Sequence, residues 1–215
     1  DAGMRDMLQD QRDEFWYLTV GNANVPMPSM PDGDRDALRE GVVQGLYRCR
    51  GDAAADLQLL GSGAIMSEVL RARTLLREDF GLESAVWSAT SYSELQRDGI
   101  ACERAARLGD EARLSVVERR LAPTRGPVIA ASDYVRAWPE LIRAFVPRRY
   151  VVLGTDGFGR SDTRAALRAF FEVDAESIVI AALHALAQDG AVDSLQASDA
   201  RRRYGQAAAP PPWRR

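Results

Sequence analysis

The sequence contains no lysine, because all 28 of its basic residues are arginine. A Schiff-base lysine and the lysine of a phosphate-binding P-loop are therefore excluded. Histidine is nearly absent as well, and His184 alone would have to serve a Ser-His-Asp triad or a zinc site. It lies within the apolar run 177–187, so a packed core or helix-face histidine is the favoured interpretation.

Cysteine is scarce, and long apolar runs are missing. Cys49 and Cys102 are too few for a disulfide scaffold and form no close-spaced metal motif, so we expect two reduced thiols in a cytoplasmic protein. No apolar run reaches the length of a membrane span and no signal peptide is recognisable, which predicts no membrane partner. The chain begins at Asp1 without an initiator methionine, so we expect a piece of a longer polypeptide.

The excess of either charge is small. A net charge of −3 gives no reason to expect nucleic acid or an anionic surface as a partner. Apolar residues make up 46% and charged residues 27% of the chain, as in ordinary globular proteins. A length of 215 residues allows one full domain, or one domain and part of another.

Strands and helices alternate along the chain from about residue 54 onward. Such alternation requires crossover connections, so the sequence predicts an α/β fold with three α/β/α layers and a mostly parallel sheet. The strands are expected at 57–60, 84–90, 126–132 and 148–155, and the helices from about 65, within 91–109, over 133–146 with a break near Pro139, around 162–171 and over 175–189.

The first fifty residues follow a less regular pattern. Prolines at 26, 28 and 31 predict an extended loop. The other elements expected there are the end of a helix over 1–12, a strand in the aromatic run 15–20, a helix over 35–47 and a linker over 49–56.

The run LLGSGA over 59–64 is similar to the start of a dinucleotide-binding motif. Only the first two glycines of G-x-G-x-x-G are present, because position 66 is methionine. A close-packed strand-to-helix turn is therefore the favoured interpretation, although its backbone amides also suit an anion.

The stretch LGTDGFGRSDTR over 153–164 follows a predicted strand, where α/β sheets carry their functional loops. Its glycines permit positive φ angles, Asp156 and Asp162 are able to accept backbone amides, and Ser161 or Asp162 is expected to cap the next helix. The sequence is compatible with two interpretations of this stretch, a rigid loop held by its own hydrogen bonds and a catalytic loop. Arg160 is a candidate carboxylate clamp or interface ion pair.

Five stretches of the sequence, in unchanged order, closely resemble the C-terminal part of the homodimeric-type pyruvate dehydrogenase E1 component. They are LTVGNANVPMPSMP, LLGSGAI, VWSATSYSELQRDGIACER, ASDYVRAW and VLGTDGFGRSDTRAALRAFFEVDAESIV. That family belongs to the transketolase-like enzymes that depend on thiamine diphosphate. The resemblance runs from about residue 10 to about residue 190.

The resemblance implies a transketolase C-terminal-like domain over 54–190, preceded over 1–53 by the end of the pyrimidine-binding middle domain and a linker. The Ala-, Pro- and Arg-rich stretch 191–215 is expected to be a flexible tail. The full-length enzyme would decarboxylate pyruvate on thiamine diphosphate and Mg²⁺, and acetylate the lipoyl groups of an E2 dihydrolipoyl acetyltransferase. It would act as a homodimer.

The family's diphosphate-and-magnesium motif, and the glutamate that activates the aminopyrimidine, do not occur in these 215 residues. The chain by itself is therefore expected to bind no cofactor or metal and to be inactive. Its expected role is to contact the rest of the E1 chain and a second subunit, and to form one wall of the active site.

The sequence departs from the family in the loop NANVPMP. Where well-known members carry a glutamate and, three residues later, a histidine, this chain has Ala23 and Pro26, and neither can transfer a proton. No catalytic residue is therefore assigned, and Asn22 and Asn24 are candidate substrate-side contacts. The candidate residues for an interface or an active-site rim are Asp98, Arg104, Asp156, Arg160, Ser161 and Asp162.

Ala23 and Pro26 also support a second hypothesis from another class. The chain would then be a non-catalytic interaction or regulatory module of a diverged 2-oxo acid dehydrogenase or transketolase-like protein. For Asp98 and Arg104, a solvated, salt-bridged helix face is the simpler alternative.

Overall fold

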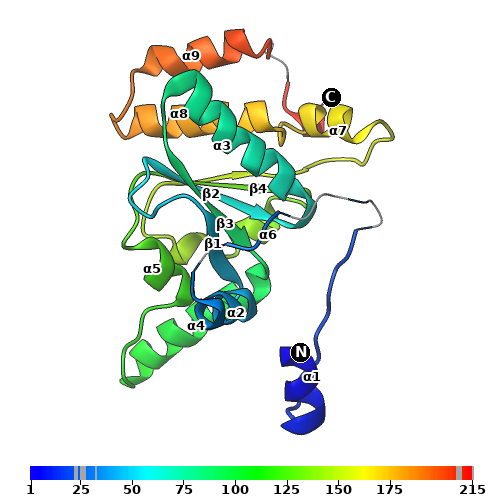
Figure 1. Ribbon diagram of the computed structural model, residues 1–215, viewed down its shortest axis with the longest axis vertical. Coiled ribbons are helices and arrows are strands. Elements are labelled where there is room, and N and C mark those ends of the chain that lie inside the picture. Colours follow the sequence, from blue (N-terminus) through cyan, green and yellow to red (C-terminus); the bar gives the residue numbers. More distant parts are fainter. Residues whose placement is uncertain (22–23, 25–27, 32, 207–209, 215) are drawn as a thin grey trace. The chain divides into compact units, whose positions relative to one another are not determined.

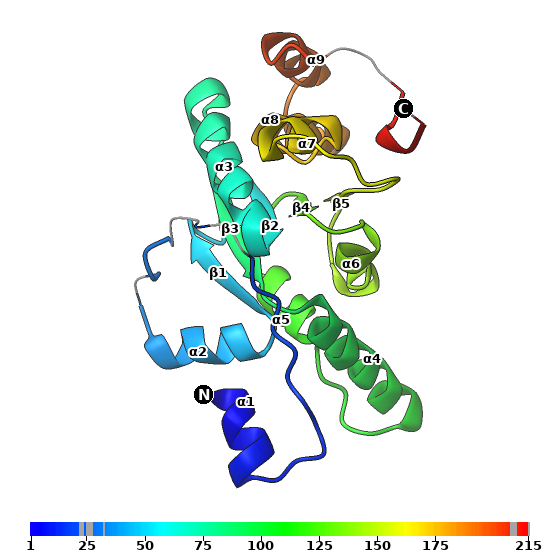
Figure 2. The same cartoon turned by 90° about the vertical axis from the view of Figure 1, so that its right-hand side faces the viewer.

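The computed structural model describes residues 1–21, 24, 28–31, 33–206 and 210–214. They form two compact units, Asp1–Met30 and Pro31–Arg215. The second unit holds the whole described sheet, which Figures 1 and 2 show from two directions.

In the first unit a short α-helix continues into a wider turn. α1 (Ala2–Met4) leads into a π-helical segment, Arg5–Gln9, as expected for the start of the chain. Trp16 lies over Gly3, because a Cβ on that glycine would be 2.5 Å from Cγ of the indole. The strand predicted over 15–20 is wrong: these residues form no strand and most of their large side chains are exposed. A strand needs a hydrogen-bonded neighbour, and the described residues of this unit provide none.

Five strands of the second unit form one sheet in the order β1-β3-β2-β4-β5. β2, β3, β4 and β5 run parallel to one another, whereas β1 pairs with β3 in the antiparallel direction. The mostly parallel sheet predicted from the sequence is therefore confirmed. The strands are β1 (Leu46–Arg50), β2 (Leu57–Ser62), β3 (Ser84–Ala89), β4 (Val128–Ser132) and β5 (Tyr150–Leu153).

Helices cover both faces of this sheet, which gives the three layers that the alternating pattern predicts (Figures 1 and 2). α3, α8 and α9 lie on one face, and α4, α5 and α6 lie on the other. The helices of the second unit are α2 (Arg35–Val43), α3 (Met66–Phe80), α4 (Tyr92–Leu108), α5 (Val116–Leu121), α6 (Ala137–Glu140), α7 (Arg164–Phe170), α8 (Ala175–Gln188) and α9 (Ser194–Arg203).

The sheet separates two hydrophobic cores, because successive residues of a strand face opposite sides. Leu60 of β2 packs with Trp87 and Leu95 under α4, whereas its neighbour Leu59 packs with Leu76 of α3 and the residues of α8. Helices on both faces explain why the central strands are almost continuously apolar in sequence.

The linker predicted over 49–56 is wrong at its start, since Cys49 and Arg50 belong to β1. This strand has the sequence LYRCR, and only Leu46 in it is fully buried. An edge strand with two arginines lacks the apolar run that marks the buried strands. The predicted domain boundary after residue 53 stays a prediction, although β1 shares the sheet of the strands that follow it.

The helix predicted over 133–146 is much shorter in the structure. Only Ala137–Glu140 are α-helical (α6), and Arg143–Phe145 form a 3₁₀ turn. Pro139 lacks the amide hydrogen that a longer helix would need. Its carbonyl oxygen accepts a hydrogen bond from Tyr150 Oη at 2.9 Å, which fixes α6 to β5.

Where the sequence predicted a flexible tail from 191 onward, Ser194–Arg203 form α9 instead. Ala200 is fully buried against α8, and Ala197 and Tyr204 pack beside it at helical spacing. Tyr204 Oη donates to Asp79 Oδ2 at 2.8 Å, and Arg203 forms an ion pair with the same carboxylate. These two alanines and one tyrosine form only a weak hydrophobic stripe among many arginines. The sequence pattern therefore does not predict α9.

Candidate functional site

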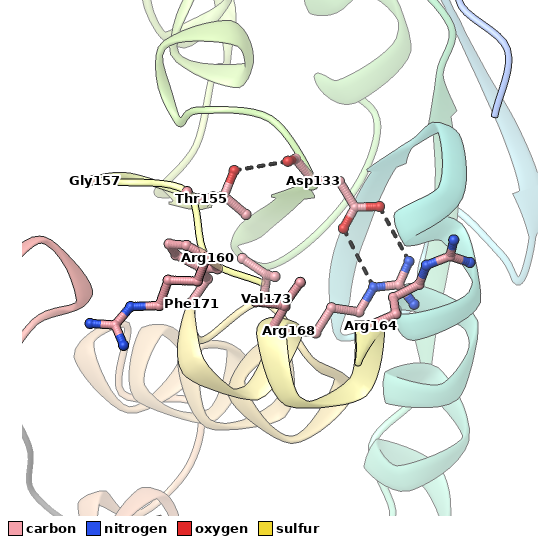
Figure 3. A pocket seen from close by; sticks show the side chains of 10 residues that line it. Asp133, Thr155, Gly157, Arg160, Arg164, Arg168, Phe171 and Val173 are labelled. Atoms are coloured by element: carbon pink, nitrogen blue, oxygen red, sulfur yellow. Dashed lines mark hydrogen bonds and ion pairs between the residues drawn. The ribbon is translucent and has the colours of Figure 1, made fainter. Parts of the chain in front are cut away.

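Four loops follow the carboxyl ends of the parallel strands and meet at one edge of the sheet. In such folds this edge is where ligands and catalytic groups are placed. The loops after β4 and β5 lie beside each other, because β4 and β5 are hydrogen-bonded neighbours. α7 crosses this edge and carries Arg164 and Arg168, and Figure 3 shows Arg168 directed at Asp133 of the loop after β4.

Arg168 of α7 is the buried charge at this edge, with 8% of its surface exposed. Its Nε and Nη2 atoms donate to the two carboxylate oxygens of Asp133 at 3.4 and 3.2 Å. Nη1 donates to Glu68 Oε1 at 3.0 Å and to Ser67 Oγ at 3.3 Å, and Nη2 also donates to the carbonyl oxygen of Ala64 at 3.1 Å. All five donors of a guanidinium are thus engaged by the protein. Arg168 therefore orders the edge and has no donor left for a ligand.

The loop after β5 is bonded to the loop after β4. Thr155 donates from its amide to the carbonyl oxygen of Tyr134 at 3.0 Å, and from its hydroxyl to that of Asp133 at 2.8 Å. Asp156 accepts the amide of Arg136 at 3.1 Å and its Nε at 2.7 Å. The predicted ability of Asp156 to accept a backbone amide is confirmed. Its carboxylate fixes one loop against the other.

The rest of the glycine-rich loop ends in a helix cap. Gly157 has a φ of +106°, which only glycine adopts at little cost. Asp162 accepts the amide of Thr163 at 2.6 Å. The cap of α7 itself is Thr163, whose hydroxyl accepts the amide of Ala166 at 3.3 Å. The expectation that Ser161 or Asp162 caps this helix is wrong by one or two positions.

A hollow of about 290 Å³ lies between the loop after β5 and α7 (Figure 3). Leu167, Phe171 and Val173 make part of its lining apolar, while Thr155 and the Arg168–Asp133 pair add polar groups. A second hollow of about 300 Å³ adjoins it and is lined in part by Ser161 and Asp162. Both share Arg160 and Leu167. The guanidinium carbon of Arg160 is 4.1 Å from the centre of the Phe170 ring, a cation–π contact.

The structure therefore brings four predicted residues together on one loop and leaves two elsewhere. Asp98 and Arg104 lie on α4 and line neither hollow. Asp98 accepts the amide of Val116 at 2.6 Å and Nη1 of Arg113 at 2.7 Å, so it fixes the start of α5. Arg104 is exposed. The salt-bridged helix face is the interpretation that fits Asp98.

The other candidate residues from the sequence that the structure describes are not arranged as a catalytic or binding site. His184 is exposed on α8, which makes it a helix-face histidine rather than a core one. Burial raises the pKa of the Cys49 and Cys102 thiols, so neither is an activated nucleophile. Asn24 is exposed. Asn22, Ala23 and Pro26 lie outside the described residues.

Sequence reasoning missed the residues that organise the edge, Asp133 and Arg168. Asp133 directly follows the buried strand β4, a position that the strand-end rule could have selected. Arg168 is buried whereas Arg164, four residues earlier in α7, is exposed, yet both are arginines and the local sequence does not distinguish them. Its partners Glu68 and Asp133 are far away in the chain, so no local pattern marks it.

Residues 45–174 match the family described as the transketolase-like TK C-terminal domain. This match covers β1 to α7, including both loops that form the edge. The chain belongs to this family. Membership accounts for the transketolase-like C-terminal fold that the sequence resemblance implied.

Comparison with individual proteins of the family agrees. The chain is 48% identical over 209 residues to the pyruvate dehydrogenase E1 component of Pseudomonas aeruginosa, a match that covers 94% of this chain and 23% of that protein. The protein of the same name from Escherichia coli K12 is 41% identical over 193 residues, which cover 89% of this chain and 22% of that protein. The chain thus spans less than a quarter of the length of these relatives and matches their C-terminal part.

Solved structures show the same fold at lower sequence similarity. A transketolase from Pichia stipitis, in a complex with sedoheptulose 7-phosphate, superposes with a TM-score of 0.51 at 16% identity. The superposition covers 76% of this chain and 20% of that chain. At this identity the similarity concerns the fold alone.

Proposed function

We propose that the chain is the C-terminal part of a pyruvate dehydrogenase E1. The full-length enzyme would decarboxylate pyruvate and transfer the acetyl group to the lipoyl groups of an E2 dihydrolipoyl acetyltransferase. The observation that carries the proposal is the identity of 48% to a protein of that name, over 94% of this chain. The hollows at the carboxyl edge support a role as one wall of a larger site.

The proposed enzyme uses thiamine diphosphate and Mg²⁺, which supply the carbanion chemistry when they are bound. The residues of this chain do not fit these groups. The sequence has no G-D-G motif, and the described residues contain no group of three or more His, Cys, Asp or Glu side chains placed to hold a metal ion. The cofactor would therefore be held by parts of the E1 chain outside these residues, and the chain alone would be inactive.

The proposed partners are the remainder of the E1 chain and a second E1 subunit, in addition to E2. None of the described helices is long and apolar enough to cross a membrane. We place the enzyme in the cytoplasm, where pyruvate is formed by glycolysis. Within it, the loop after β5 would shape the edge that faces the other parts of the dimer.

The first test is the reduction of an artificial electron acceptor by the full-length polypeptide in the presence of pyruvate, thiamine diphosphate and Mg²⁺. The 215-residue chain serves as the blank. We expect turnover by the full-length protein and none by the blank. A folded, cofactor-loaded protein that fails to turn over pyruvate would contradict the proposal.

Asp156→Asn in the full-length protein separates two roles of the edge. This variant keeps the shape of the side chain, but its single acceptor oxygen can keep only one of the two hydrogen bonds from Arg136, and the ion pair is lost. A wall of the active site predicts that turnover falls by up to about 10²-fold while the dimer stays intact. A role in assembly predicts dissociation, measured by light scattering. Asp199→Asn, on the exposed face of α9, is the matched control and should change neither.

The alternative function is a non-catalytic interaction or regulatory module. It is favoured by Ala23 and Pro26, which stand where the family resemblance predicts a glutamate and a histidine. Replacing both with Glu and His in the full-length protein distinguishes the two functions. If this pair creates turnover that the natural sequence lacks, the module is the better description.

A further inference from the structure

The last described residues of the chain return to the glycine-rich loop. Pro212–Arg214 form a 3₁₀ turn, and Trp213 lies directly against Gly157. A Cβ on this glycine would be 3.0 Å from Cα and 3.3 Å from Cβ of the tryptophan. The absence of a side chain at Gly157 is therefore what lets the two backbones approach so closely.

The indole of Trp213 also rests on a cation whose position is already fixed. The guanidinium carbon of Arg136 is 5.6 Å from the centre of the indole, and its Nε donates to Asp156 at 2.7 Å. Because Asp156 holds the guanidinium in place, the cation–π contact needs little further ordering of Arg136. Half of the Trp213 surface is covered, with 51% exposed.

The turn is held close to this place by α9. Gln206 Nε2, just after the helix, donates to Ser177 Oγ of α8 at 2.8 Å. Only three residues separate Gln206 from Pro210, which begins a run of three prolines. A short tether gives the turn a high effective concentration at the loop, and the prolines lower the entropy lost when it is ordered. A few weak contacts are then enough to hold it.

Gly157 also lines the hollow of about 290 Å³, so the turn sits at the rim of that hollow. Figure 3 shows it in red at the side where Gly157 and Arg160 lie. We propose that the C-terminal segment 210–214 is a strap, which closes the loop after β5 over this hollow and opens it on release. The strap does not depend on the chemistry proposed for the full-length protein.

The first experiment measures hydrogen exchange of the amides at 157–162 in the 215-residue chain. Trp213→Ala removes the indole, and removal of all residues after Gln206 takes away the whole strap without changing the loop. Each should speed this exchange about two- to fivefold, the effect expected for losing one exposed cation–π contact. Trp213→Phe keeps an aromatic ring and should restore most of the protection. Trp16→Ala, in the other compact unit, is the matched control and should have no effect.

A second readout reports on the hollow itself. Val173 lines it and is fully buried, so Val173→Cys should react with a thiol reagent only when the loop opens. Cys49 and Cys102 also react, so their rate is measured in the chain that keeps Val173 and is subtracted. The remaining rate, that of Cys at position 173, should rise by the same factor when the strap is removed.

Three results would overturn the proposal. Equal exchange at 157–162 with and without the strap would mean that the turn only rests on the surface. Faster exchange in β5 as well would mean that the variants loosen the fold in general rather than the loop. Cysteine reactivity that stays constant in all variants would contradict the opening of the hollow.

Discussion

Arg168 and Asp133 join α7 to the carboxyl end of β4 through two hydrogen bonds, of 3.4 and 3.2 Å. Glu68 of α3 binds the same guanidinium and also accepts the amide of Ala175 at the start of α8, at 3.1 Å. One cation therefore neutralises two carboxylates that come from different layers of the fold. Arg168 therefore stabilises this edge of the sheet, and because all its donors are already bonded it does not bind a ligand there.

We expect Arg168→Met to lower the free energy of unfolding by about 3 kcal/mol, because Asp133 loses this counterion and Glu68 is left with the ion pair to Arg71, at 3.5 Å. Urea titration followed by circular dichroism measures this as a lower midpoint. Arg202→Met is the control, since its side chain is 81% exposed and its ion pair among the described residues is with Asp199 of the same helix. It should stay within about 0.5 kcal/mol of the natural chain. Equal midpoints for the two variants would rule out this role of Arg168.

The position of the α7 cap gives a second prediction. Thr163→Ala should cost about 1 kcal/mol, because its hydroxyl accepts the amide of Ala166 at the first turn. Ser161→Ala, two residues earlier, removes an exposed hydroxyl and should change stability by less than about 0.5 kcal/mol. Thermal or urea unfolding of both variants decides the matter. A larger loss of stability in Ser161→Ala than in Thr163→Ala would mean that Ser161 caps the helix.

Gly99 of α4 faces the ring of Phe145, and a Cβ there would lie 2.4 Å from its Cε2 atom. Gly99→Ala should therefore lower stability by about 1–3 kcal/mol, even though alanine favours helices. Combining it with Phe145→Leu should recover part of the loss, because the smaller side chain makes room. A double variant that is as unstable as the sum of the single variants would contradict direct crowding.

Alkaline pH should weaken the attachment of α9. Burial, and then the hydrogen bond to Asp79, raise the pKa of Tyr204 well above its ordinary value. A group whose pKa is raised in the folded state contributes stability that is complete below its unfolded pKa, about 10, and is lost as the pH rises beyond it. Tyr204→Phe should therefore lose stability less steeply above pH 10, by at most about 1.4 kcal/mol per pH unit. No lysine titrates in this range to obscure the effect. Identical slopes for both proteins would show that Tyr204 ionises freely.

The sequence predicted β2 to β5 because buried parallel strands carry apolar runs that any window detects. It also predicted α3 and α4, but it missed α5 and made the helix between β4 and β5 too long. It failed at β1 and at the run 15–20 for opposite reasons. β1 is an edge strand with polar residues, and it forms because β3 offers a neighbour. The run 15–20 has strand composition, but the described residues of its unit offer none.

The site divides in the same way. Asp156, Arg160, Ser161 and Asp162 could be selected as candidates because they are close in sequence, on one loop after a strand. Arg168 and Asp133 are 35 positions apart and meet only through the crossover between β4 and α7. Contacts of this kind depend on the topology of the sheet, which local patterns do not contain.

Leu59 and Leu60 are covalent neighbours, yet the sheet assigns them to opposite cores. A change at Leu60 reaches the packing of α4, and a change at Leu59 reaches that of α3 and α8. The effects of two substitutions on the free energy of unfolding usually add when the two sites share no contacts. Residues that are adjacent in the chain seldom meet this condition. The sheet therefore separates the two hydrophobic cores, and substitutions in one core leave the packing of the other unchanged. Variation could redesign one surface of this domain while the other keeps its packing.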